Sequence, residues 1–293
     1  STAHTVEYRE DMMILVTGAT GNIAGYLIPT LREGGHAVRA LIRDESKGGP
    51  LRDLGADVAI GDTETGQGLG EAITGVDTIC LITGNGETGS QQMRNVIKAA
   101  RDSGGPRIVK LSGYGVGRIM EQHEEVEEEL AASGLRFTVV KPTFFMQNVM
   151  LAAGTIASDG MMYMPFGDGR IGMIDIRDVA DVLSAVLTSE GHDGKSYVLT
   201  GPAAISFHEV AAGISNAIRQ DVTYVDVPAE AARESILGMG MPEWTTDGFI
   251  EVFQGFKDGY GDLTTPNVEQ LTGHPARSFE VFASDFAGVF GAN

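Results

Sequence analysis

The stretch from residue 13 to residue 33 constrains the fold most, because an apolar run breaks into glycines and then continues as an amphipathic segment. The run, residues 13–17, is short and continuous, which fits a strand buried on both faces, as in parallel sheets covered by helices. The amphipathic segment, residues 26–33, is typical of a helix that packs one face on a sheet. The stretch therefore predicts a strand, a tight turn and a helix.

The glycines of this turn suit a phosphate ligand. Gly18 allows a turn that a side chain would block, and Gly21 lets the backbone approach a pyrophosphate, whose charge meets the unpaired N–H groups of the helix start. Ala24 stands at the third position of the dinucleotide fingerprint, where Gly or Ala is allowed. The first gap is one residue longer than in G-x-G-x-x-G, and many glycine-rich turns bind nothing, so the motif alone leaves both interpretations open.

Composition argues against several classes of function. The chain has 293 residues and a formal net charge of -19, which disfavours a nucleic acid or an anionic membrane as partner, because binding phosphates requires clustered Lys and Arg. Cys80 is the only cysteine, so no internal disulfide forms, and we expect a buried strand residue there rather than a nucleophile. Neither a transmembrane stretch of ~18 apolar residues nor a signal pattern is found, and we expect a cytoplasmic protein.

Strand and helix patterns alternate along the first half of the chain. Further strands are expected at 36–43, 57–62, 75–83, 107–112 and 137–142, with helices at 90–102 and about 120–132. Such alternation predicts an α/β fold with a doubly wound parallel sheet and right-handed crossovers. After a polar tail, residues 1–11, we predict a Rossmann-type domain over residues 12–150. A smaller mixed α/β lobe, residues 151–293, is expected to be interleaved with it and to close over a cofactor.

Three local signals place elements in the second half. Asp178 is expected to be the N-cap of a helix that ends at Thr188. Ser206 and Glu209 have the spacing of a capping box, which predicts that another helix begins there. Residues 221–227 are expected to form a late strand.

Polar residues follow several of the predicted strands, where open α/β sheets bind ligands. Arg43 ends the second strand, at the position where an acid favours NAD and an arginine accommodates the 2′-phosphate of NADP; Lys47 adds charge. The alternative is an exposed Arg43 that pairs with Asp44. Asp62 is expected at the adenine edge, although it could equally be an ordinary turn residue.

The loop after the fourth predicted strand is expected to pass beneath the ribose and diphosphate through Thr83 and Asn85. Adaptable apolar side chains, including Met146 and Met164, gather after the sixth predicted strand. Methionine fills irregular gaps, so these residues either complete the core or line a substrate pocket.

Several motifs occur in an order that resembles the NmrA-like branch of atypical short-chain dehydrogenases, over roughly residues 13–286. They are Thr17-Gly18-Ala19-Thr20-Gly21-Asn22-Ile23, Gly61-Asp62, Gly75-Val76-Asp77, Lys110-Leu111-Ser112, His123-x-x-x-Glu127, Pro142-x-x-Phe145-Met146-x-Asn148, Asp175-Ile176-Arg177-Asp178 and Leu199-Thr200-Gly201-Pro202. Within the family, the chain looks most similar to bacterial NAD(P)H:quinone oxidoreductases and triphenylmethane reductases.

This resemblance implies a Rossmann fold that binds NADPH and donates hydride to a small conjugated acceptor, such as a quinone, a dye or an enone. The cofactor residues expected on this basis, together with the strand-end positions above, are Gly18, Thr20, Gly21, Asn22, Ile23, Arg43, Lys47, Asp62, Thr83, Asn85, Ser112, His123, Pro142, Thr143, Phe144 and Phe145. The expected substrate residues are Tyr114, Phe145, Met146, Met164 and Trp244.

The chain departs from ordinary short-chain dehydrogenases, which use a Tyr one helical turn before a Lys to exchange a proton with the substrate. Tyr114 and Arg118 have that spacing but fall in a glycine-rich loop, and His123-x-x-x-Glu127 stands where the pair would be. We expect the proton to come from water or from His123 with its ordinary pKa of about 6.5. The alternative for His123 is a purely structural hydrogen bond to Glu127 or to the cofactor ribose.

Two other functions are compatible with this pattern. A non-catalytic NADP(H)-binding sensor that regulates a partner protein also needs no Tyr–Lys pair. Sugar-nucleotide epimerase chemistry fits less well, because it normally requires that pair. The sequence leaves a monomer and a homodimer open as the oligomeric state.

Overall fold

Short runs of branched apolar residues form one parallel sheet in the computed structural model, which describes residues 12–291; the predicted tail, residues 1–11, lies outside the described residues. The strands are β1 (Met13–Val16), β2 (Ala37–Ile42), β3 (Asp57–Ile60), β4 (Thr78–Leu81), β5 (Arg107–Leu111), β6 (Phe137–Pro142) and β9 (Lys195–Leu199). Their order is β3-β2-β1-β4-β5-β6-β9, and every neighbouring pair is parallel. The predicted Rossmann-type sheet is confirmed.

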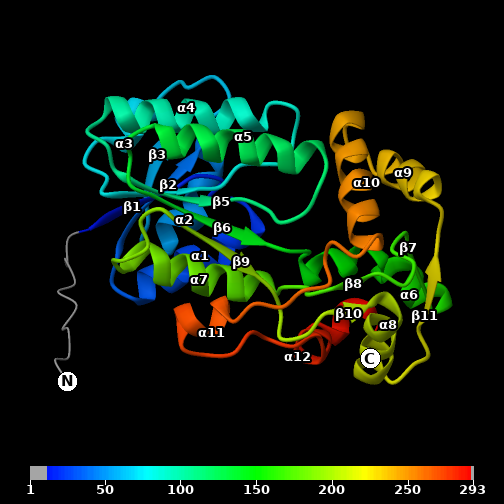
Figure 1. Cartoon of the computed structure of the whole chain (residues 1–293). Coiled ribbons are helices and arrows are strands. Elements are labelled where there is room, and N and C mark those ends of the chain that lie inside the picture. The colour runs from blue at the N-terminus through cyan, green and yellow to red at the C-terminus, as the bar shows by residue number, and fades with distance from the viewer. Residues whose placement is uncertain (1–11, 292–293) are drawn as a thin grey trace.

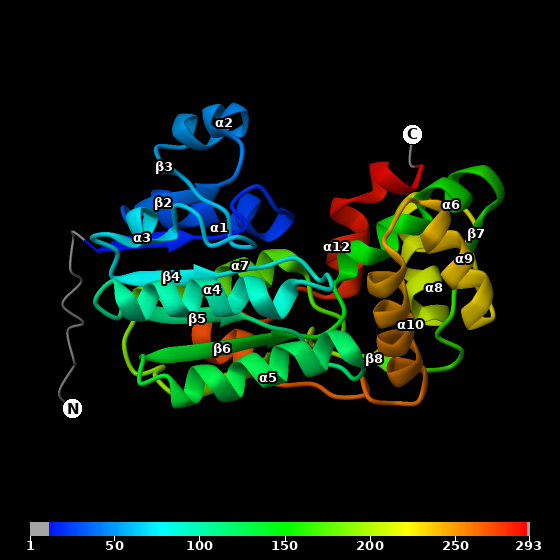
Figure 2. The same ribbon diagram turned by 90° about the horizontal axis from the view of Figure 1, so that it is seen from above.

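Helices cover both faces of this sheet (Figures 1 and 2). One face carries α1 (Asn22–Glu33), α7 (Ile176–Thr188) and α11 (Asn267–Thr272), and the other carries α3 (Leu69–Ile73), α4 (Gly89–Asp102) and α5 (Arg118–Ala132). After β2 the chain forms a short 3-10 turn, η1 (Glu45–Lys47), and α2 (Gly48–Asp53). Because helices bury both faces, the central strands β1 and β4 are largely apolar on both sides, and Cys80 in β4 is fully buried as predicted.

A second hydrophobic core lies in the C-terminal part of the chain, beside the sheet in Figure 2. It is formed by η2 (Met146–Ala152), α6 (Ala153–Asp159), β7 (Met161–Met164), β8 (Arg170–Ile171), β10 (Ile205–Ser206), α8 (Phe207–Ile218), β11 (Thr223–Asp226), α10 (Glu243–Lys257), α12 (Phe279–Asp285) and η3 (Ala287–Phe290), and α9 (Ala229–Gly238) contacts α10. The expected late strand is β11, which pairs with β7 outside the main sheet. Helix α7 and strand β9 lie between these elements in sequence but pack with the main sheet.

Of the two helix starts predicted from capping signals, the start of α8 is as expected and the start of α7 is not. The capping box of Ser206 and Glu209 is present and begins α8, as expected. The N-cap of α7 is Asp175 and not Asp178, because the Asp175 carboxylate accepts a hydrogen bond from the backbone N of Arg177 at 2.9 Å. Asp178 is buried one turn further on, where its carboxylate accepts from the backbone N of Arg277 at 2.7 Å. The expectation failed because both aspartates in this segment satisfy the same pattern.

The buried Arg107 ties the start of β5 to the end of α7. Its guanidinium donates to the carbonyl oxygens of Val186 at 2.7 Å, Leu187 at 2.8 Å and Ser189 at 3.0 Å. The last carbonyl groups of a helix have no partner within the helix, and a cation there also interacts favourably with the helix dipole. Arg107 therefore caps α7 from a distant part of the chain.

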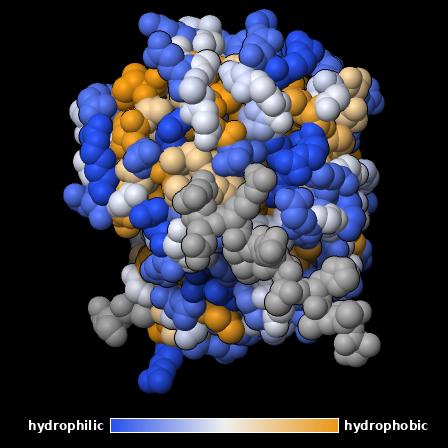
Figure 3. Space-filling view, turned by 90° about the vertical axis from the view of Figure 1, so that its left-hand side faces the viewer, coloured by the Kyte–Doolittle hydropathy of each residue, from blue (hydrophilic) through white to orange (hydrophobic). Residues whose placement is uncertain are grey.

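The surface agrees with the acidic composition. The face drawn in Figure 3 is mainly hydrophilic, and its hydrophobic residues lie in scattered groups. Within residues 12–291, the helices are all too short or too polar to cross a membrane.

Candidate active site

The turn between β1 and α1 is open to solvent and built for a close ligand approach. Gly18 has a φ of +59°, and a Cβ there would lie 3.0 Å from the carbonyl oxygen of Ile82. Gly21 is the N-cap of α1, and Thr20, Gly21 and Asn22 are exposed. The first N–H groups of α1 therefore point outward with no side-chain cap, which is the arrangement that binds anions at helix starts. Ile23, by contrast, is a core residue.

The end of β1 is held rigidly against β4. The Thr17 hydroxyl donates to the carbonyl oxygen of Ile82 at 2.7 Å and accepts from the backbone N of Ile82 at 2.8 Å. Both groups belong to the turns that follow parallel strands, so the two loops keep a fixed separation. These bonds connect the glycine turn to the loop after β4.

Arg43 and Lys47 are exposed at the end of β2 and in the turn after it. The Asp44 carboxylate accepts from the backbone N of Ser46 at 2.9 Å and caps the 3-10 turn. Across the described part of the chain, Arg43 forms neither an ion pair nor a hydrogen bond, so the considered Arg43–Asp44 pair is not present. The guanidinium is available to an anionic group.

The loops after β3 and β4 carry the next predicted residues. Asp62 is half-buried, and its carboxylate accepts from the backbone N of Glu64 at 2.8 Å, as a turn residue does. The Thr83 hydroxyl is buried and has no hydrogen-bond partner among residues 12–291. A buried polar atom without a partner is rare in proteins, and its place at the carboxyl end of β4 suits a ligand that passes there. The open glycine turn, the free Arg43 and the unpartnered Thr83 together fit a phosphorylated dinucleotide.

Next to this loop lies a cluster of polar side chains from β5, α5 and β6. Lys110 Nζ is 2.9 Å from His123 Nδ1 and 3.3 Å from Glu127 Oε1. The Ser112 hydroxyl donates to Glu127 Oε1 at 2.5 Å, and Lys141 Nζ pairs with Glu127 Oε2 at 2.6 Å. Glu127 therefore joins two lysines and a serine. His123 contacts Lys110 and not Glu127, although His123 and Glu127 are one turn apart on α5.

Burial changes the protonation of this cluster. The Lys110 side chain is 0% exposed, and burial lowers its pKa to about 8, against the opposing effect of Glu127. Burial, with the charges of Lys110 and Lys141, lowers the pKa of His123 to about 3. The expected pKa of about 6.5 for His123 is therefore wrong, because the ring lies in the interior beside two cations. His123 is neutral near pH 7.

Sequence reasoning missed Lys110 and Lys141 as members of the site. The available signal was a charged residue within each of two buried apolar strands, RIVKL and FTVVKP. A lysine in such a strand requires a partner, because an unpaired buried charge is costly. The partner, Glu127, comes from α5, and its position beside the two lysines depends on how α5 packs on the sheet.

The segment after β6 is used mainly for packing. Pro142 is buried at the end of β6, and the buried Thr143 hydroxyl donates to the carbonyl oxygens of Gly172 and Leu199. Phe144 packs edge-on against Phe166 and other rings of the second core. Met146 is also a core residue, 2% exposed, which fits the packing alternative for this methionine.

Four predicted substrate residues keep some exposure to solvent, and they come from different elements of the fold. Phe145 and Met164 are half-buried. Tyr114, in the loop after β5, stacks on Tyr260 with ring centroids 5.4 Å apart. Trp244 of α10 is half-buried, and the guanidinium of Arg118 lies 5.9 Å from the centre of its ring. Tyr114 and Arg118 are not a helical pair, because α5 begins only at Arg118.

Arg118 joins the sheet domain to α10. Its guanidinium donates to Glu251 Oε1 at 2.8 and 2.5 Å, and its backbone N donates to Glu251 Oε2 at 2.8 Å. The two guanidinium N–H groups share one carboxylate oxygen and the backbone N–H binds the other, so three charge-assisted hydrogen bonds hold the carboxylate. The start of α5, close to the polar cluster, is therefore anchored to the C-terminal elements.

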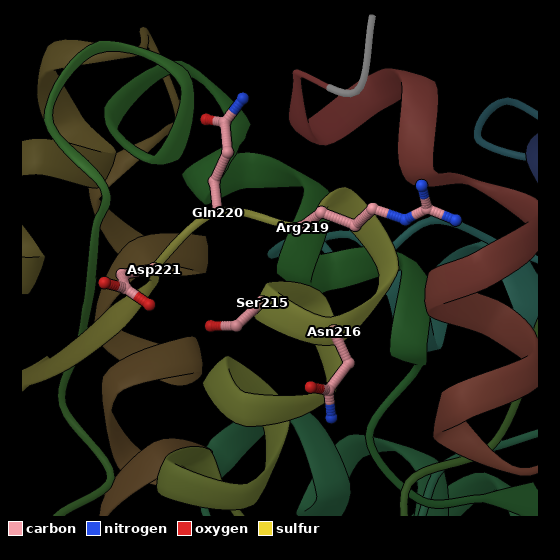
Figure 4. Close-up of a pocket in the computed structure, with 5 residues that line it drawn as sticks. All are labelled: Ser215, Asn216, Arg219, Gln220 and Asp221. Atoms are coloured by element: carbon pink, nitrogen blue, oxygen red, sulfur yellow. The ribbon is translucent and has the colours of Figure 1, made fainter.

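Two other groups of polar residues lie away from this site. A surface pocket of about 480 Å³ is lined by Ser215, Asn216, Arg219, Gln220 and Asp221, at the end of α8 and the turn that follows (Figure 4). The Ser215 hydroxyl already accepts from the backbone N of Val222 at 2.9 Å. Separately, Asp178, Asp181 and His274 have ligand atoms close together. The guanidinium of Arg277 bonds to both aspartates, which makes this group an ion-pair network joining α7 to the C-terminal segment.

Known proteins share this sequence pattern and this fold. The sequence model of the NmrA-like family matches residues 10–279. An NAD(P)H azoreductase of Xenophilus azovorans is 36% identical over 288 residues, covering 96% of this chain and 100% of the relative. The crystal structure of an NADPH-dependent quinone oxidoreductase from Escherichia coli, complexed with NADPH, has a TM-score of 0.86 at 26% identity, covering 94% of this chain and 99% of the other. The structure of the negative transcriptional regulator NmrA with NADP, at 20% identity and a TM-score of 0.77, covers 96% of this chain and 97% of that chain and shares the fold.

Proposed function

The chain belongs to the NmrA-like family, and on this premise we propose that it is an NADPH-dependent oxidoreductase that transfers hydride to a small conjugated acceptor, such as a quinone, a dye or an enone. The observation that supports NADPH as cofactor is the exposed glycine turn at the start of α1, together with Arg43 after the neighbouring strand β2, which has no ion pair within residues 12–291. The proposed reductase activity is supported by the names of two relatives, an NAD(P)H azoreductase and a quinone oxidoreductase.

NADPH would supply the hydride, and the chain's own residues would bind and orient it. The backbone of Gly18, Thr20, Gly21 and Asn22 suits the diphosphate. Arg43 and Lys47 suit the 2′-phosphate, and the unpartnered Thr83 hydroxyl suits the central part of the cofactor. We retain Asp62, Asn85, Ser112, His123 and the residues 142–145 as proposed contacts; the packing of Thr143 and Phe144 leaves mainly their backbone for this role.

The polar cluster favours an acceptor that needs little acid assistance. His123 is neutral and therefore provides no imidazolium to protonate a substrate oxygen. Conjugated acceptors such as quinones stabilise the charge that hydride addition creates, so water is a sufficient proton source. Tyr114, Phe145, Met164 and Trp244 remain proposed substrate contacts, whereas Met146 would act by packing behind them.

The C-terminal part, residues 151–293, would act as a smaller lobe that closes over the cofactor, although α7 and β9 of this part pack with the sheet of residues 12–150. We further propose a cytoplasmic monomer or homodimer. Light scattering after size-exclusion chromatography would determine the oligomeric state.

The experiment that tests the function is the oxidation of NADPH, followed at its near-ultraviolet absorbance, with a panel of quinones, azo and triphenylmethane dyes and enones. We expect turnover with at least one acceptor class. A Gly21→Val variant places a side chain in the proposed diphosphate site and should abolish turnover, while Asn216→Ala, at the pocket of Figure 4, should retain it. Tight NADPH binding without turnover of any acceptor would instead indicate a cofactor sensor.

A further inference from the structure

The two ring nitrogens of His123 have unequal partners. Nδ1 lies 2.9 Å from Lys110 Nζ, which is an ordinary hydrogen-bond distance. Nε2 lies 3.5 Å from Asn85 Oδ1, which is long for a hydrogen bond. Asn85 is exposed in the loop after β4, so Nε2 faces the side of the cluster that is open to a ligand.

The donor at Nδ1 determines where the ring proton resides. A lysine ammonium has three donor hydrogens and no acceptor, so Nδ1 must accept and the proton of the neutral ring must be on Nε2. The charge on Lys110 is supported by Glu127 Oε1 at 3.3 Å. Lys141 pairs with the other oxygen of Glu127 and opposes that charge from β6, while Ser112 donates to Oε1.

We propose that Lys110 is a positioning residue that holds His123 as its neutral Nε2–H tautomer, so that the imidazole presents a fixed hydrogen-bond donor to an acceptor atom of a ligand bound beside Asn85. The Lys110 side chain is 0% exposed, so its ammonium donates to the ring and to Glu127 rather than to solvent. The proposed tautomer rests on the contacts of Lys110 with His123 and Glu127, whereas its use in ligand binding rests on the proposed function.

On the side of the ring that faces Asn85, polar groups are available for further hydrogen bonds. The Thr83 hydroxyl, on the same loop as Asn85, is buried without a partner among the described residues. A ligand that binds along this loop, such as a cofactor with ribose hydroxyls, would offer separate oxygens to Nε2–H and to the Thr83 hydroxyl. An Nδ1–H tautomer would reverse the donor and the acceptor and leave Nε2 unable to donate.

Nitrogen-15 NMR of histidine-labelled protein tests the tautomer directly. The chain has six histidines, and a His123→Gln variant identifies the resonances of His123 by their loss. Near pH 7 we expect a protonated Nε2 and an unprotonated Nδ1. A protonated Nδ1, in either the other tautomer or the imidazolium, would overturn the proposal without reference to any ligand.

Two matched variants test the role of Lys110. Lys110→Met removes the ammonium at Nδ1, so we expect both neutral tautomers of His123 in this variant. We expect the variant to bind NADPH more weakly by roughly 3- to 10-fold, the range of one hydrogen bond. Lys98→Met removes an exposed lysine of α4 that pairs with Asp102 and has no contact with the ring, and we expect it to keep the Nε2–H spectrum and wild-type binding within about twofold. If Lys110→Met fails to fold, the wild-type spectrum still decides the tautomer.

Titration with NADPH separates this inference from the proposed function. We expect the Nε2–H resonance of wild-type His123 to shift on binding, and to shift less in Lys110→Met. NADPH binding without any change at Nε2 would reject the role in the ligand site. No NADPH binding by the wild type would reject the proposed function and that role, and the tautomer would still be judged by the ligand-free spectrum.

Discussion

Arg43 is the residue on which the choice between the two pyridine cofactors depends. Its guanidinium is exposed at the end of β2 and has no ion pair within the described residues. Arg43→Ala should weaken NADPH binding by on the order of 1.5–3 kcal/mol, the range of a charged hydrogen bond, and leave NADH binding nearly unchanged. Calorimetric titration with both cofactors measures this difference, with Arg101→Ala on the exposed side of α4 as control. Equal losses for both cofactors would refute the 2′-phosphate assignment.

His123 should make the protein sensitive to acid. Its pKa is lowered to about 3 by burial and by the charges of Lys110 and Lys141, so below about pH 6.5 the unfolded chain binds a proton that the folded chain does not. The free energy of unfolding therefore falls as pH decreases, by about 2 kcal/mol between about pH 6.5 and pH 5. Urea unfolding should show a smaller loss over this interval for His123→Gln, whereas the exposed His208→Gln should behave as the wild type. Identical pH dependence in all three proteins would contradict the buried neutral ring.

At the scale of single residues, the sequence predicted on which element a residue lies better than which side chain it contacts. Gly18 and Gly21 lie in the turn that the strand-turn-helix pattern predicted, and Arg43 follows β2 where the second strand was expected to end, because both patterns are local. Lys110 was visible as a charge in an apolar strand, but the position of its partner was not. That partner lies 17 residues further along the chain, on α5, and only the packing of α5 on β5 and β6 brings it close. Local sequence carries no information about such a contact.

At the scale of elements, the docking of α10 depends on glycines that lack room for a side chain. A Cβ on Gly255 would overlap Cγ2 of Val116, in the loop that leads to Arg118. Gly255→Ala should therefore destabilise the protein by about 1–3 kcal/mol, although alanine is normally the better helix residue. Gly25 in α1 has open space at its Cβ position, so Gly25→Ala should be neutral or stabilise by up to about 1 kcal/mol. Denaturant unfolding of both variants measures the contrast, and a stabilising Gly255→Ala would show that α10 does not pack as described.

The sequence predicted that these helices and strands exist more reliably than it predicted where each begins and ends and which strands pair. Strand β6 has the predicted bounds, because its apolar residues and Pro142 mark both ends. The start of α7 was misplaced by one turn, since Asp175 and Asp178 are both good N-caps and only the tertiary contact of Asp178 with Arg277 distinguishes them. Strand β11 was predicted, but its pairing with β7 depends on a contact between distant segments.

At the scale of the whole molecule, the sequence predicted the parallel sheet because alternating strands and helices permit few topologies. The second core was less predictable. It is built from Phe144, Phe166 and Phe207, which lie far apart in the chain and meet through ring stacking and edge contacts. Between the two cores lies the start of α5, where Arg118 holds α10 against the sheet domain. Binding at the site should therefore stabilise both parts together.

This coupling gives a measurable prediction for the intact protein. A ligand that binds only the folded state stabilises it by about 2.7 kcal/mol at a concentration of 100 times its Kd. For a chain of this size, such a gain corresponds to a rise in Tm on the order of 5 °C. In differential scanning calorimetry, NADPH should raise the Tm more than the same concentration of NADH, and Arg43→Ala should remove that difference.

Arg118→Met breaks the link to α10, so in calorimetry without added cofactor it should separate the unfolding transition into two steps or lower its Tm. A single, unshifted transition in Arg118→Met would show that the two parts are coupled by other contacts, because the ion pair with Glu251 would then contribute little.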